Sequence, residues 1–106
     1  MRFKKGDIVV IPVPFTDNAT VKKRPAVVLF NDVGDVLVAQ ITSKIHHDNL
    51  SYKLMSSDMS VPLPKQSYVR IYKLFVMQEH LIEKKVSELL PFAYSQLVVR
   101  ISALIS

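Results

Sequence analysis

The chain has 106 residues, of which 49% are hydrophobic and only two are glycine, so it can form one hydrophobic core and lacks a low-complexity composition. Its 14 Lys and Arg residues outnumber the nine Asp and Glu residues, and the formal charge of +5 suits a polyanionic partner such as nucleic acid. The lack of cysteine excludes disulfides, thiol nucleophiles and cysteine metal sites, and no uncharged stretch approaches the roughly 20 residues that span a bilayer. We therefore predict a single cytoplasmic domain over residues 1–106 that does not associate with a membrane.

The first half of the sequence predicts three β-strands. Residues 8–12 are rich in β-branched side chains and end at prolines that cannot donate to a sheet ladder. A polar, exposed loop is expected over residues 15–23. Residues 25–30 and 36–41 are nearly continuous apolar runs on either side of a turn, so we expect both to be central strands covered on both faces.

The second half predicts further strands over residues 51–54 and 67–72, and a last short strand over residues 75–82. Strand alternation places Tyr68, Arg70 and Tyr72 on one face.

A helix is expected at the C-terminal end of the sequence. Pro91 suits the first turn of a helix, and the following apolar residues recur at spacings of three and four. Short strands followed by one helix predict a mainly β fold, a compact barrel or curled sheet capped by that helix.

Two arginines and two hydroxyl side chains are the first candidates for a phosphate site. Arg24 precedes Pro25, whose ring favours an extended backbone at this position, and Arg70 lies on a predicted strand. Thr42 and Ser43 close the third strand. A guanidinium offers paired donors and stays charged, so arginines with hydroxyl donors can hold a phosphate. Surface arginines in salt bridges and a turn-forming Thr-Ser pair account for the same residues in purely structural terms.

Basic and aromatic side chains add candidates for nucleic-acid binding. Lys22 and Lys23 belong to a possible basic rim around the first strand, for which ordinary solvated charge is the alternative. The rings of Tyr52, Tyr68 and Tyr72 could stack on unpaired bases or could line the core.

The adjacent histidines His46 and His47 suggest a metal or general-base site. Adjacent residues on an extended segment point in opposite directions, so we expect this pair to serve neither purpose. The sequence predicts no metal and no cofactor.

Four segments in this order and spacing resemble the PemK/MazF family of type II toxin–antitoxin endoribonucleases: residues 6–10 (GDIVV), 23–29 (KRPAVVL), 38–43 (VAQITS) and 67–70 (SYVR). The resemblance extends over nearly the whole chain. It implies an SH3-like β-barrel with a C-terminal helix, a homodimer, an acidic antitoxin partner and metal-independent cleavage of single-stranded RNA by the ribose 2′-hydroxyl. It also implies that Arg24 and Thr42 act at the scissile phosphate, with Ser43 and Arg70 in support and Lys22, Lys23 and Tyr72 as possible RNA contacts.

The segment after Arg70 departs from the family pattern. Some relatives have an acidic residue followed by glutamine there, whereas this chain has Ile71, Tyr72 and Lys73. Two alternatives therefore stand beside the endoribonuclease: a catalytically inactive module that binds RNA or protein, and a toxin that inhibits a protein target such as a topoisomerase.

Overall fold

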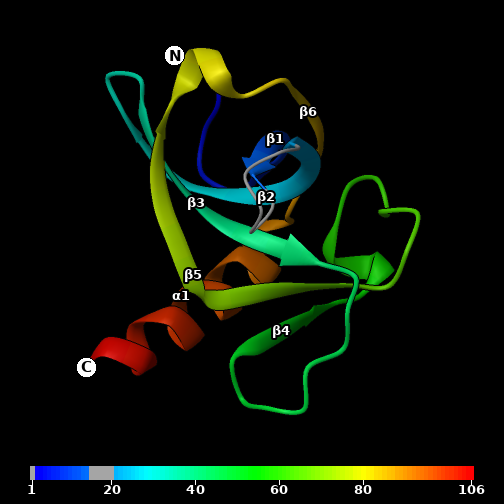
Figure 1. Cartoon of the computed structure of the whole chain (residues 1–106). Helices are drawn as coiled ribbons and strands as arrows, with labels where there is room; N and C mark the ends of the chain where they lie inside the picture. The colour runs from blue at the N-terminus through cyan, green and yellow to red at the C-terminus, as the bar shows by residue number, and fades with distance from the viewer. Residues whose placement is uncertain (1, 15–20) are drawn as a thin grey trace.

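A computed structural model describes residues 2–14 and 21–106. Its six strands are β1 (Asp7–Pro14), β2 (Val21–Asp32), β3 (Asp35–Thr42), β4 (Ser51–Leu54), β5 (Ser67–Gln78) and β6 (Lys84–Glu88). Two 3-10 turns, η1 (Ser56–Asp58) and η2 (Glu79–Leu81), precede β5 and β6, and the helix α1 (Pro91–Ile105) follows the last strand. The strands form one antiparallel sheet in the order β4-β5-β3-β2-β1-β6, which curls around a core, and α1 packs against β5 (Figure 1).

The central position predicted for β2 and β3 is confirmed. Val27 and Val28 are adjacent, point to opposite faces and are both fully buried. Val27 belongs to a core cluster that also contains Leu97 of α1, and Val28 belongs to a second cluster on the other face with Ile82. Both faces of the middle of the sheet are therefore covered, as the continuous apolar sequences of β2 and β3 require.

The element boundaries differ from the prediction in two places. Part of the expected loop, residues 21–23, belongs to β2, whereas residues 15–20 lie outside the described part of the chain. The strand predicted over residues 75–82 is wrong, because residues 75–78 continue β5, η2 follows, and the last strand is β6. The β5 strand bends within residues 70–73, where its pairing with β3 shifts register, so one long strand lies along two parts of the curled sheet.

A buried carboxylate joins the start of β1 to β6. Asp7 is only 2% exposed, and its carboxylate accepts hydrogen bonds from the Lys4 backbone N–H at 3.0 Å and from the Lys4 ammonium at 3.1 Å. The Lys85 ammonium lies at the same distance, 3.1 Å. Burial by itself would raise the pKa of Asp7, but the hydrogen bonds from Lys4 and Lys85 outweigh it, so the pKa is lowered.

Candidate nucleic-acid interface

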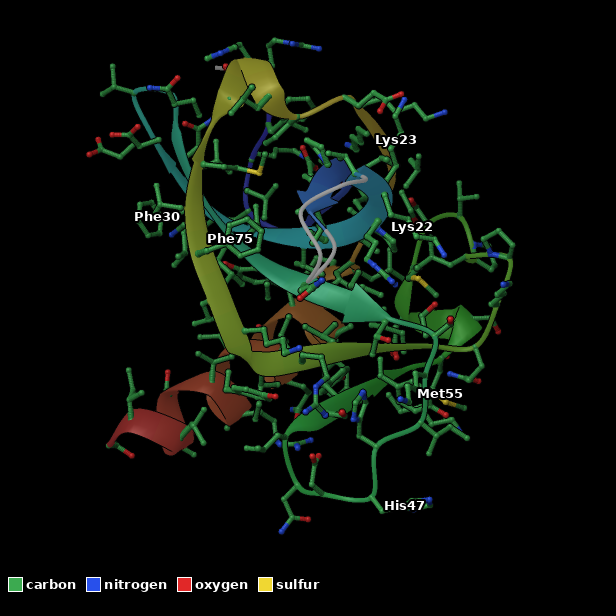
Figure 2. The ribbon with its side chains drawn as sticks, viewed as in Figure 1. Lys22, Lys23, Phe30, His47, Met55 and Phe75 are labelled. Carbon is green, nitrogen blue, oxygen red and sulfur yellow. The ribbon has the colours of Figure 1, made fainter. Side chains whose placement is uncertain are left out.

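A cationic cleft opens where β2 begins, β3 ends and β5 begins. Its volume is about 250 Å³. Its cations are Lys22, Lys23 and Arg24 from β2, together with Lys65, and no acidic residue lines it within the described part of the chain. Figure 2 shows Lys22 and Lys23 on the same side of the molecule. The Lys23 ammonium lies 2.9 Å from the Glu83 carboxylate, and the residues that line the cleft still carry an excess of positive charge, which suits a polyanion.

Arg24 is held on a strand rather than on a loop. It lies opposite Ile11 in the β1–β2 ladder, and Pro25 follows it in extended conformation. Its side chain is half-buried, and within residues 2–14 and 21–106 no hydrogen bond or ion pair engages its guanidinium. A fixed backbone and an uncommitted guanidinium are the properties that a phosphate contact needs.

The hydroxyl groups of Thr42 and Ser43 lie at the end of β3. Ser43 lines the cleft, whereas Thr42 lies beside it. Thr42 Oγ1 accepts a hydrogen bond from the Lys44 backbone N–H at 3.1 Å, which leaves the hydroxyl proton available for an acceptor.

The wall of the cleft opposite β2 was not predicted. It consists of Leu63, Pro64 and Lys65, which precede β5. The segment is held from two sides: Ser87 Oγ donates to the Val61 carbonyl at 2.6 Å, and Gln66 Nε2 donates to the Leu54 carbonyl at 2.8 Å. The prolines mark a loop in the sequence, but its position depends on these contacts with distant strands.

The Arg70 side chain is buried outside the cleft. It is 4% exposed, and its guanidinium donates to Ser51 Oγ at 2.6 Å, to Asp48 at 3.2 Å and to Tyr72 Oη at 3.0 Å. It also lies 4.8 Å from the centre of the Tyr72 ring. Arg70 and Tyr72 therefore form a clamp with Asp48 and Ser51, and neither residue lines the cleft.

The contacts within the clamp favour the charged forms of Asp48 and Arg70. The hydrogen bond from the Leu50 N–H, which outweighs burial, and the contact with Arg70 lower the pKa of Asp48. Burial opposes the charge of Arg70, but Tyr72 and Asp48 outweigh it and its pKa is raised. Only Arg70 Nε is buried without a partner among the described side chains. The guanidinium is thus committed to the segment between β3 and β4.

The two adjacent histidines lie in that same segment, and Figure 2 shows His47 at its outer end. In the described residues no group of three or more His, Cys, Asp or Glu side chains gathers as metal ligands would. Across residues 2–14 and 21–106, no helix is long and apolar enough to cross a bilayer.

The fold and the cleft together define a small β-barrel protein with a cationic cleft on its surface. The family model for the PemK-like, MazF-like toxin of type II toxin–antitoxin systems matches residues 4–104. The chain belongs to this family. Comparison with curated protein sequences finds no significant match.

Solved structures of MazF proteins share the fold. A MazE–MazF complex from Deinococcus radiodurans superposes with a TM-score of 0.77 at 17% identity, over 99% of this chain and 97% of that one. The Mycobacterium tuberculosis toxin MazF-mt6 gives a TM-score of 0.71 at 19% identity, over 92% and 93% of the two chains. A mycobacterial endoribonuclease in complex with its cognate antitoxin gives 0.76 at 12% identity, over 95% and 92%. The predicted mainly β, SH3-like barrel with a C-terminal helix is confirmed.

Proposed function

We propose that the protein is the toxin of a type II toxin–antitoxin system and acts as a metal-independent endoribonuclease on single-stranded RNA. The observation that carries this proposal is the cleft, where four cations and the Ser43 hydroxyl converge in a chain of this toxin family. Solved relatives include an endoribonuclease bound to its cognate antitoxin, which supports an antitoxin partner for this chain as well.

The reaction proposed is transesterification within the RNA backbone. The ribose 2′-oxygen forms a bond to phosphorus, the bond to the 5′-oxygen breaks, and the products carry a cyclic phosphate and a 5′-hydroxyl. One proton leaves the 2′-hydroxyl and one reaches the 5′-oxygen. The pentavalent intermediate carries extra negative charge, which the Arg24 guanidinium stabilises while the Thr42 hydroxyl donates to a phosphoryl oxygen.

The test is cleavage of single-stranded RNA in the presence of a chelator. Arg24→Ala is expected to lower the rate by about 10²–10³, which is the usual loss for one preorganised donor, while the fold is retained. Arg24→Lys should also be slow, because an ammonium keeps the charge but loses the planar fork. Arg2→Ala removes the same charge outside the cleft and is the matched control.

The outcomes separate the alternatives. Wild-type cleavage by Arg24→Ala would remove this residue from the site. Binding of RNA by the wild-type protein without any new RNA ends would identify a binding module instead. Activity that requires an added metal ion would contradict the metal-independent mechanism.

A further inference from the structure

A row of polar side chains crosses the sheet beside the cleft. Tyr68 of β5 pairs with Thr42 of β3 on one side and with Lys53 of β4 on the other. Residues that are directly opposite in antiparallel strands project from the same face, so these three side chains stand abreast.

The face that carries the row is the one away from α1. Ile41 and Val69 are paired neighbours of Thr42 and Tyr68, and both are buried in the core cluster that contains Leu97 of the helix. Because successive residues alternate, Thr42 and Tyr68 point to the other side.

Arg24 extends the row to a fourth strand. The β2–β3 ladder pairs Ala26 with Gln40, and the same register continued by two residues places Arg24 opposite Thr42. The row Arg24, Thr42, Tyr68, Lys53 covers three strand spacings, or about 14 Å. This is long enough for more than one nucleotide.

Tyr68 differs from the other three tyrosines of the chain. Tyr52 and Tyr94 pack against the core, and the Tyr94 hydroxyl donates to the Leu29 carbonyl at 2.9 Å. Tyr72 is 45% exposed, but its hydroxyl accepts a hydrogen bond from Arg70 and the Arg70 guanidinium lies over its ring. Tyr68 is half-buried, and among the described residues its hydroxyl has no hydrogen-bond partner and its ring belongs to neither core cluster. The backbone of Tyr68 is fixed in β5, and its ring is not part of either core cluster.

We propose that Tyr68 is the stacking platform for the unpaired base next to the scissile phosphate, and that Lys53 contacts a neighbouring phosphate. This inference rests on the proposed function and assigns part of its substrate site. A ring fixed on a strand between a phosphate-binding pair and a lysine offers the alternation of aromatic and cationic groups that single-stranded nucleic acid requires.

The first experiment uses fluorescence. The chain contains no tryptophan, so Tyr68→Trp introduces a single reporter at the proposed platform. Single-stranded RNA of randomised sequence with 2′-fluoro riboses, which cannot be cleaved by this route, should quench that reporter on binding. Phe92→Trp, on an exposed position of α1, is the control and should not be quenched.

The second experiment measures affinity. Tyr68→Phe keeps the ring and should bind the same RNA within about twofold of wild type, whereas Tyr68→Ser should bind roughly 5- to 150-fold more weakly. Lys53→Ala should lower the slope of log affinity against log salt by about one.

An unquenched Tyr68→Trp that still binds RNA overturns the inference, even if Tyr68→Ser fails to fold. So does wild-type affinity of Tyr68→Ser. Both results leave the proposed function standing as long as Arg24→Ala abolishes cleavage. If the wild-type protein neither binds nor cuts RNA, the proposed function fails and the platform fails with it.

Discussion

Replacement of Arg70 distinguishes a structural clamp from an RNA contact. Its guanidinium makes charge-assisted hydrogen bonds to Asp48 and hydrogen bonds to Ser51 and Tyr72 while only 4% exposed. Loss of one partner of a buried pair destabilises a protein by about 3–5 kcal/mol. The side chain of Asp48 is 36% exposed and can be hydrated once it is released, which reduces this cost. We therefore expect Arg70→Ala to lower the free energy of unfolding by about 2–4 kcal/mol.

The assay is thermal and urea unfolding followed by circular dichroism at neutral pH. For a chain of this length about 1 kcal/mol corresponds to roughly 4 °C, so the midpoint should fall by roughly 8–16 °C. Arg70→Met fills most of the volume without donors and isolates the polar contribution. Arg70→Lys keeps the charge but cannot reach three partners at once, so it should lie between alanine and wild type.

RNA binding is the second measurement, and it tests whether Arg70 contacts phosphate instead. A clamp residue leaves the salt dependence of RNA affinity unchanged, whereas a phosphate contact would reduce its slope by about one when removed. The reasoning is refuted if Arg70→Ala loses less than about 1 kcal/mol of stability and at the same time weakens RNA binding with a shallower salt slope.

Three further predictions concern acid, salt and assembly. The pKa of Asp7 is lowered in the folded state, so its contribution to stability is present above its ordinary pKa near 3.8 and is lost as the pH falls through the lower folded value. Asp7→Asn should therefore flatten this part of a curve of unfolding free energy against pH. An unchanged curve would contradict the stabilising role of the Asp7 carboxylate. Affinity for single-stranded RNA should fall steeply with salt, and an acidic antitoxin segment should compete for the same cations; an affinity that ignores salt would exclude phosphate contacts as the main interaction. We expect a homodimer of the 12.0 kDa chain, because apolar side chains including Phe30, Val98 and Ile105 line an open groove between α1 and the sheet; a monomeric mass in sedimentation equilibrium at micromolar concentration would count against it.

Local patterns in the sequence predicted most of the fold. The continuous apolar runs of β2 and β3, the exact bounds of β4 and the spacing of α1 each depend on residues close together in the chain. The end of β5 and the whole of β6 could not be predicted from local patterns. The 3-10 turn η2 interrupts the segment, and the sequence of β6, KKVSE, has little apolar character. Its pairing with β1 supplies the order that its own composition lacks.

The candidate site was predictable only in part. Arg24 and Ser43 were found from short motifs, and the cleft brings them together with Lys22 and Lys23. Lys65 was missed because a loop is positioned by distant partners. Arg70 shows the converse difficulty: its sequence neighbours do not reveal that Asp48, 22 residues earlier, holds its guanidinium. Which arginine is committed to a partner and which is available for a ligand depends on contacts that sequence spacing does not contain.

The pairing of β1 with β6 has a consequence for synthesis on the ribosome. Asp7 pairs with Glu88, and the cluster that buries Ile8 and Ile41 is completed by Leu97 of α1. A nascent chain that has emerged only through β5 has neither the strand nor the helix needed to cover its first strand, and such long-range contacts form late in folding. We therefore expect this domain to fold only after β6 and α1 have emerged from the ribosome, and not while the earlier strands alone are exposed.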